Sequence, residues 1–244
     1  MEQTFKDKTV LVTGAGWGIG AAAALLYGAC GAKVVVSDTS QKRGMDTVTK
    51  INSQNGTATY IKSEVSIATA CKKLIKRTIE IYGSIDIACN NSAIFCESLY
   101  PADKHKYAFH KGVALNLNSL HNCMEYEIEA MLKQGSGIII NTSFILGAID
   151  LASLNRFVRA KYGIAALLQN TAEKYPARHI QIKTITPTFI DTALLHATIR
   201  PEMGKRVEQS PTARLGMAHE VASLVLWLSS DKTQLLPTVL PDHN

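Results

Sequence analysis

Residues 9–38 constrain the fold more than any other stretch of the chain, and they read TVLVTGAGWGIGAAAALLYGACGAKVVVSD. A short apolar run over 10–12 leads into a turn that carries glycine at every second position from 14 to 20. An Ala- and Leu-rich segment with helical spacing follows, and a second apolar run then ends at Asp38. This order predicts a strand, a glycine turn, a helix and a second strand that ends at an acidic residue.

The glycine turn predicts a dinucleotide-binding site. Glycines let the backbone pass close to a pyrophosphate, and the unpaired N–H groups at the start of the following helix stabilise its negative charge. Asp38 lies 18 residues after Gly20, where an acid can accept hydrogen bonds from the adenosine ribose hydroxyls. The alternative is a glycine turn that only packs a helix on a strand. The strand before the turn, the helix after it and the acid together favour the dinucleotide site.

The rest of the chain continues the alternation of strands and helices. The apolar patterns predict strands over 57–62, 85–89, 138–140 and 180–185, and helices over 41–53, 68–82, 103–133, 155–175 and 218–229. Such alternation is typical of an α/β fold with a Rossmann-like, doubly wound parallel sheet. No repeat, low-complexity tract or long linker interrupts the 244 residues, which suffice for one well-buried core. We therefore expect a single domain over 1–244.

The composition excludes several classes of function. The 26 Lys and Arg residues and 20 Asp and Glu residues give a net charge of +6, but the charges are scattered, so a solvated surface is expected rather than a nucleic-acid interface. No apolar run approaches the ~20 residues that span a bilayer, and the first eight residues lack an apolar signal region, so a cytoplasmic protein without membrane contact is expected. The odd number of cysteines and the lack of a Cys-x-x-Cys pair predict reduced buried thiols and no metal site; they are Cys30, Cys71, Cys89, Cys96 and Cys123.

Several short motifs together resemble one family. They are TGAGWGIG at 13–20, Asp38, SIDIACNNSA at 84–93, NTSF at 141–144, Lys161, TPTFIDT at 186–192 and ARLGMAHEVA at 213–222. With these landmarks the chain resembles the single-domain short-chain dehydrogenase/reductase (SDR) family over essentially its whole length. The resemblance implies a seven-stranded parallel sheet flanked by helices, with NAD(P) lying across the C-terminal strand ends. It also implies a homotetramer or homodimer, and a small molecule as the substrate.

The resemblance also implies which residues bind the cofactor. They come from the glycine turn, the ends of the second to fourth strands, the helix that carries the family lysine, and the segment after the sixth strand. In this sequence they are Gly14, Trp17, Gly18, Ile19, Gly20, Asp38, Glu64, Val65, Asn91, Ser92, Ala93, Lys161, Pro187, Thr188, Ile190 and Thr192.

Asp38 and Trp17 favour NAD(H) over NADP(H). The Asp38 carboxylate would repel a 2′-phosphate, and Trp17 stands where NADP-binding members of the family often carry Arg or Lys. Lys42 and Arg43 follow soon after, but we expect both to face solvent.

The catalytic residues depart from the family pattern. Asn116 matches the family asparagine that supports a proton-relay water, and Lys161 matches the family lysine. The family tyrosine precedes that lysine by four residues, and here the position holds Phe157. The family serine precedes the tyrosine by 13 residues, and here the position holds Phe144. Two retained residues therefore accompany two replaced ones.

The replacements have a direct chemical consequence. Hydride transfer to a carbonyl leaves an alkoxide that must gain a proton, and phenylalanine has none to give. Positioned proton transfer is typically worth ~10²–10⁴ in rate, and an oriented carbonyl donor adds a comparable factor. Phe144 and Phe157 are thus expected to be inert, and standard carbonyl and alcohol redox activity to be weak or absent. The residues that could still supply a proton are Tyr100, His105, Tyr107, His110 and Ser143.

Three functions therefore stay open at this point. The first is an NAD-dependent oxidoreductase with an unusual proton donor. The second is a non-redox enzyme, a cyclase or isomerase, in which Phe144 and Phe157 line an apolar pocket and NAD is structural. The third is a catalytically silent NAD-binding scaffold. The segment that shapes the family's substrate pocket falls at about 191–210.

Overall fold

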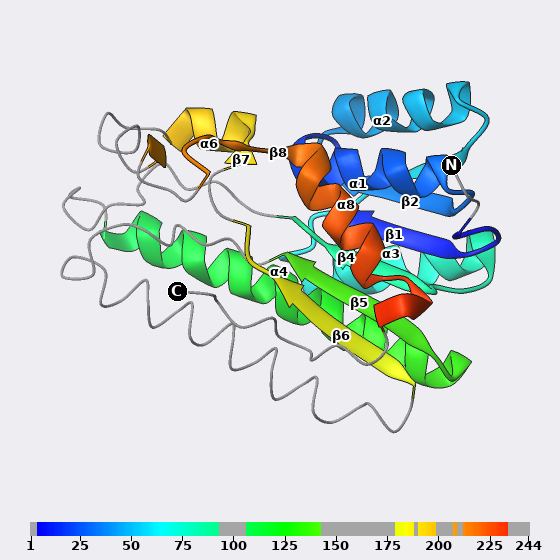
Figure 1. Ribbon diagram of the computed structural model, residues 1–244. Helices are drawn as coiled ribbons and strands as arrows, with labels where there is room; N and C mark the ends of the chain where they lie inside the picture. Colours follow the sequence, from blue (N-terminus) through cyan, green and yellow to red (C-terminus); the bar gives the residue numbers. More distant parts are fainter. Residues whose placement is uncertain are drawn as a thin grey trace.

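A computed structural model describes residues 4–92, 106–142, 179–187, 190–198, 207–208 and 212–233. The described chain forms a parallel sheet of six strands in the order β3-β2-β1-β4-β5-β6, flanked by helices on both faces (Figure 1). The strands are β1 (Thr9–Thr13), β2 (Lys33–Asp38), β3 (Thr57–Lys62), β4 (Ile87–Asn90), β5 (Gly137–Thr142) and β6 (Ile180–Ile185). This confirms the predicted Rossmann-like fold; the described residues contain six of the seven strands that the family resemblance implied.

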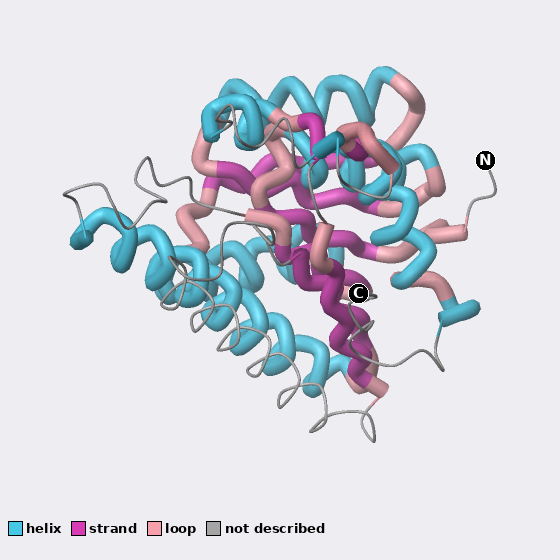
Figure 2. Tube along the Cα trace, turned by 60° about the vertical axis from the view of Figure 1, so that its left-hand side comes forward, coloured by secondary structure: helices cyan, strands magenta, loops and turns pink. Residues whose placement is uncertain are grey.

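Two layers of helices cover the sheet (Figure 2). One core cluster joins the sheet to α1 (Gly18–Ala29), α2 (Gln41–Ser53) and α8 (Ala218–Leu228). The other joins it to α3 (Ala68–Tyr82) and α4 (Lys106–Gln134). Because side chains alternate along a strand, Val10 and Val12 enter the first cluster while Leu11 enters the second. Every residue of β1 is buried, which explains why the strand reads as a continuous apolar run.

A small second sheet lies beyond the end of β6. It consists of β7 (Ile190–Asp191) paired in parallel with β8 (Gly216–Met217). The short helix α6 (Ala193–Thr198) follows β7, and the 3-10 turn η2 (Asp231–Thr233) follows α8. This pairing fixes the backbone of Ile190 and Asp191 near the C-terminal edge of the main sheet.

Most sequence-predicted elements have the expected bounds, notably 41–53, 57–62, 68–82 and 180–185. The strand predicted over 85–89 begins later, at Ile87, because the backbone of Ile85 forms hydrogen bonds with a side chain of α4 instead. The Ile85 N–H donates to Gln134 Oε1 at 3.2 Å, and Gln134 Nε2 donates to the Ile85 carbonyl at 2.9 Å. The helix predicted over 155–175 lies outside the described residues. The four described cysteines are buried free thiols, as predicted, and Cys96 is not among them.

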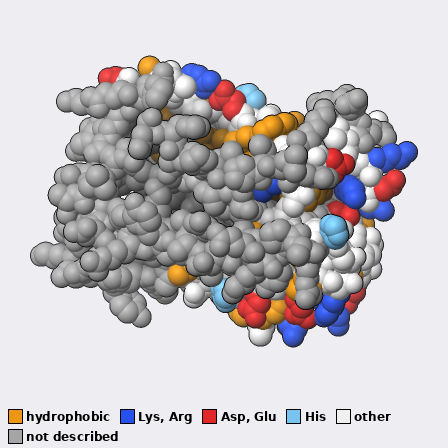
Figure 3. All heavy atoms as spheres, turned by 60° about the horizontal axis from the view of Figure 1, so that its bottom comes forward, with side chains coloured by type: hydrophobic (Ala, Val, Ile, Leu, Met, Phe, Trp, Pro, Cys, Tyr) orange, Lys and Arg blue, Asp and Glu red, His pale blue; other side chains and the backbone are white. Residues whose placement is uncertain are grey.

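On the face shown in Figure 3, the described residues carry charges of both signs close together, in keeping with the scattered sequence pattern. Within the part of the chain that the structure covers, no helix has the length and apolar character needed to cross a membrane. The same residues include no group of three or more His, Cys, Asp or Glu side chains placed to hold a metal ion.

A buried acid connects α4 to the middle of the sheet. Glu127 is fully buried, and its Oε2 accepts a hydrogen bond from Asn90 Nδ2 at 2.8 Å. The same Asn90 nitrogen donates to Asn141 Oδ1 at 3.0 Å. Burial raises the pKa of Glu127 to about 7, because desolvation disfavours the charged carboxylate. Among the described residues, neither Glu127 Oε1 nor Asn90 Oδ1, both buried, has a hydrogen-bond partner, so a neutral carboxyl with its own proton suits this site better than a carboxylate.

Candidate functional site

A pocket of about 340 Å³ opens at the C-terminal edge of the sheet. Ligands of open α/β folds bind at this edge, outside the carboxyl ends of the strands. Most of the sequence-predicted cofactor residues line it, namely Gly14, Trp17, Gly18, Ile19, Asp38, Glu64, Val65, Asn91, Ser92, Pro187, Ile190 and Thr192. The sequence thus predicted a set of residues, widely separated along the chain, that the fold brings to one cavity.

The glycine turn between β1 and α1 forms the floor of the pocket. Gly14 and Gly18 have positive φ angles of 63° and 57°, which residues other than glycine rarely adopt. A Cβ on Gly14 would lie 2.8 Å from Ser92 Cα, so the turn and the end of β4 are in close contact. Because α1 begins at Gly18, the unpaired N–H groups of its first turn lie beside the cavity and can bind an anion.

Gly20 does not line the pocket but supports the turn from beneath. A Cβ at this position would overlap Gly14 O and would lie 2.6 Å from Asn91 Nδ2. We therefore expect Gly20→Ala to push α1 away from the turn, to weaken dinucleotide binding at least tenfold and to lower the free energy of unfolding by about 1–3 kcal/mol. Calorimetric titration and urea unfolding measure the two effects. Ala21→Gly, on the next residue of α1, is the control: it should reduce stability by about 1 kcal/mol and leave affinity within twofold.

Asp38 is held in a fixed orientation at the end of β2. Its Oδ2 accepts a hydrogen bond from Gly16 N (3.0 Å) and its Oδ1 accepts one from Ser40 N (2.8 Å). The Tyr60 hydroxyl donates to the Asp38 carbonyl at 2.8 Å. Because each carboxylate oxygen has a second lone pair, Asp38 can still accept hydrogen bonds from a ligand in the pocket.

Hydrogen bonds accepted by Thr13 join β1 to the residues after β4. Thr13 Oγ1 accepts from both Asn91 N and Ser92 N, each at 3.2 Å, and Asn91 Nδ2 donates to Gly14 O at 3.4 Å. On the far side, Asn122 of α4 donates to Val65 O at 3.0 Å. These contacts fix the walls of the pocket from elements that are distant in sequence.

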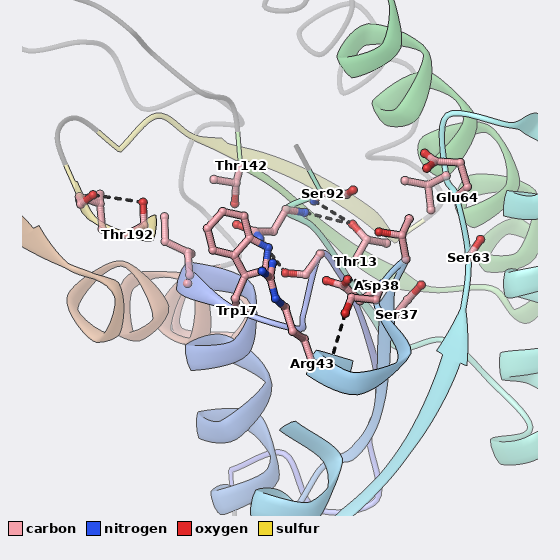
Figure 4. A pocket seen from close by; sticks show the side chains of 18 of the residues that line it. Thr13, Trp17, Ser37, Asp38, Arg43, Ser63, Glu64, Ser92, Thr142 and Thr192 are labelled. Carbon is pink, nitrogen blue, oxygen red and sulfur yellow. Dashed lines mark hydrogen bonds between the residues drawn. The ribbon is translucent and has the colours of Figure 1, made fainter. Parts of the chain in front are cut away.

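Arg43 has a position at the pocket that the sequence did not predict. Lys42 is exposed as expected, and Arg43 is exposed too, but Arg43 also lines the pocket. Its guanidinium carbon lies 5.5 Å from the centroid of the Trp17 ring, a cation–π arrangement. Figure 4 shows the guanidinium of Arg43 beside the Trp17 ring, with Asp38 next to them. The prediction that Arg43 is exposed is therefore confirmed, and the structure adds that the side chain lies beside Trp17 on the wall of the pocket.

Other pocket residues were not predicted from the sequence. They are mainly hydroxyl-bearing residues at strand ends and turns, namely Thr13, Ser37, Thr39, Ser40, Ser63 and Thr142, together with Leu195 of α6. Their position at the ends of predicted strands was the one available signal. Asn116 lies on α4 and is half-buried. Ala93, Phe144, Phe157, Lys161 and Thr188 lie outside the described residues.

The sheet order, the glycine turn and the acid at the end of β2 define a protein of the Rossmann-type, dinucleotide-binding class. Comparison with known families makes the assignment narrower. A family model described as enoyl-(acyl carrier protein) reductase matches residues 14–237. The chain belongs to the short-chain dehydrogenase/reductase family, whose members bind nicotinamide cofactors.

Relatives of known sequence cover nearly the whole chain. Cyclohexanol dehydrogenase of Acinetobacter sp. (strain SE19) is 32% identical over 231 residues, which are 95% of this chain and 91% of the relative. A short chain dehydrogenase/reductase of Aspergillus oryzae is 32% identical over 238 residues, covering 94% of this chain and 91% of the relative. These relatives place the chain among oxidoreductases of this family.

Solved structures agree with this assignment. Levodione reductase superimposes with a TM-score of 0.88 at 26% identity, covering 96% of this chain and 95% of the other. A 7α-hydroxysteroid dehydrogenase complexed with NADH and 7-oxo glycochenodeoxycholic acid also has a TM-score of 0.88, at 25% identity, and covers 98% of this chain and 93% of the other. The sequence comparisons thus establish the family, and the superposition on solved structures independently establishes the fold.

Proposed function

We propose that this chain is an NAD(H)-binding member of the family in which Phe144 and Phe157 replace the usual catalytic serine and tyrosine, so that standard carbonyl and alcohol redox activity is weak or absent. The observation that carries the proposal is the spacing from Lys161, which places Phe157 four residues before it and Phe144 thirteen residues before Phe157. The family motifs on both sides of this segment, at 138–143 and at 186–192, agree with the same alignment of the chain to the family.

The residues of the pocket have the chemistry that NAD requires. The first turn of α1 would hold the pyrophosphate, and Asp38 would accept hydrogen bonds from the adenosine ribose. Glu64, whose Oε1 already accepts a hydrogen bond from Ser66 Oγ at 2.8 Å, would accept a further hydrogen bond from the adenine amino group. Bound NAD supplies a carbon that gives or accepts hydride, and Lys161 would hold the nicotinamide ribose. Phenyl groups at 144 and 157 can shape an apolar pocket but cannot donate a hydrogen bond or a proton.

Calorimetric titration tests the cofactor assignment. We expect NAD⁺ to bind at least tenfold more tightly than NADP⁺, because the fixed Asp38 carboxylate repels a 2′-phosphate and accepts a 2′-hydroxyl. Equal affinities would overturn the preference for NAD(H), and the absence of binding by either dinucleotide would overturn the cofactor site itself.

The substrate class for activity tests follows from the relatives. Cyclohexanol, levodione and a 7-oxo steroid are named for relatives or structural neighbours of this chain. Cyclic ketones and the matching secondary alcohols are therefore the first compounds to test. We expect turnover of these compounds to be at least a hundredfold below the ~1–10³ s⁻¹ range of ordinary enzymes.

A further inference from the structure

Two threonine hydroxyls lie at one end of the pocket, on Thr142 and Thr192. Figure 4 shows both toward this end, with Asp38 and Glu64 toward the other. A dinucleotide with its adenosine on Asp38 and its pyrophosphate at the start of α1 would direct its nicotinamide half to the threonines. A substrate that exchanges hydride with the nicotinamide must then bind at the same end.

The two hydroxyls differ in their hydrogen bonds. Thr192 Oγ1 donates to Ile190 O at 3.3 Å and accepts from Leu195 N at 3.2 Å, so it is engaged at the start of α6. Thr142 is half-buried in the pocket wall, and its Oγ1 forms no hydrogen bond with any residue that the structure describes. A threonine hydroxyl has one donor and two acceptor positions, and at Thr142 all three are available to a ligand.

The end of β5 fixes the position of Thr142. In the parallel register Thr142 pairs with Ile185 of β6. The preceding residue, Asn141, is buried, and its Oδ1 accepts a hydrogen bond from Asn90 Nδ2 at 3.0 Å. Because the strand end is fixed and a β-branched side chain has few rotamers, the Thr142 hydroxyl loses little conformational freedom when it binds a ligand.

We propose that Thr142 Oγ1 binds the oxygen of a cyclic ketone or secondary alcohol at the nicotinamide end of the pocket, and so replaces the hydroxyl that position 144 lacks. The proposal rests on the proposed function, in which Phe144 cannot form this hydrogen bond. One hydroxyl can donate to a ketone oxygen and accept from an alcohol O–H, so Thr142 recognises both states of the substrate. It orients the substrate but supplies no proton, because a threonine hydroxyl without an adjacent base is not activated. This role therefore agrees with weak turnover.

Calorimetric titration of cyclohexanone into the NAD⁺ complex tests the proposal without turnover, because NAD⁺ has no hydride to give to a ketone. Thr142→Val removes the hydroxyl and keeps the shape of the side chain. It should weaken cyclohexanone binding about three- to tenfold and leave NAD⁺ binding within twofold, whereas Thr142→Ser should bind cyclohexanone within twofold of wild type. Methylenecyclohexane, which has a similar shape and no oxygen, should bind wild type and Thr142→Val equally well.

Thr57→Val is the matched control. It makes the same change at an exposed residue of β3 that does not line the pocket, and it should alter none of these affinities by more than twofold.

The outcomes separate this proposal from the one it rests on. If Thr142→Val binds cyclohexanone as tightly as wild type, or binds methylenecyclohexane more weakly to the same extent, the role of Thr142 is wrong while the cofactor site stands. The same holds if the wild-type NAD⁺ complex does not bind cyclohexanone at millimolar concentration. A loss of NAD⁺ affinity in Thr142→Val would assign the hydroxyl to the cofactor and overturn the proposal. If wild type does not bind NAD⁺, the cofactor site itself is wrong, and if wild type reduces cyclohexanone with NADH at ordinary rates, the proposed loss of activity is wrong.

Discussion

The double variant Phe144→Ser, Phe157→Tyr is expected to gain about 10²–10⁴ in the rate of NADH-dependent reduction of cyclic ketones. The tyrosine would supply the proton that the alkoxide must gain, and Lys161 four residues later would lower the tyrosine pKa toward neutrality, because a nearby cation favours the phenolate. The serine would add a hydrogen bond to the developing oxyanion. Single-turnover oxidation of bound NADH measures the effect without requiring product release.

Two further variants make this result specific. Phe144→Ala with Phe157→Leu changes the volume of the same two positions without adding a hydroxyl, and it should gain nothing. Lys161→Met in the restored background should abolish most of the gain. A wild-type protein that reduces these ketones at ordinary family rates would contradict the proposed loss of activity, since another group must then supply the proton.

The second large effect concerns the buried Glu127. Since its pKa in the folded protein is raised from 4.5 to about 7, the folded state binds a proton more tightly than the unfolded chain. The stabilising contribution is therefore complete below about pH 4.5 and is lost as pH rises to about 7, by about 3 kcal/mol. Glu127→Gln, which resembles the neutral acid, should remove this loss and be more stable than wild type by up to that amount at pH 8.

Urea unfolding at pH 4.5, 6 and 8 measures this difference. The two proteins should have similar free energies of unfolding at pH 4.5 and should diverge as pH rises. Glu125→Gln is the control, because Glu125 lies on the same helix with an exposed side chain beside His121, and its effect should stay below about 0.5 kcal/mol. A difference between Glu127→Gln and wild type that is the same at all three pH values would show that Glu127 is not the titrating group.

The strands and the glycine turn could be predicted from the sequence because each depends on the chemistry of neighbouring residues. The run at 9–13 is apolar throughout because β1 is covered by helices on both faces, and the glycines at 14 and 18 are needed for positive φ angles. By contrast, no local pattern marks Glu127 as a core residue, because its neighbours Glu125 and Glu129 are exposed and carry the same charge. Glu127 is buried because it lies on the face of α4 that packs against Asn90 and Asn141.

Sequence alone thus determined the order of the elements and the dinucleotide-type turn, and it predicts two phenylalanines at the positions where the family uses hydroxyls. These are features of residue type and spacing, and they need no knowledge of distant contacts. Only the tertiary structure decided which side chains share the pocket. Arg43 faces Trp17 across the glycine turn and Asn122 contacts the backbone of Val65, because the packing of α2 and α4 on the sheet sets those directions. That packing depends on contacts between segments far apart in the chain, which no local pattern of residues specifies.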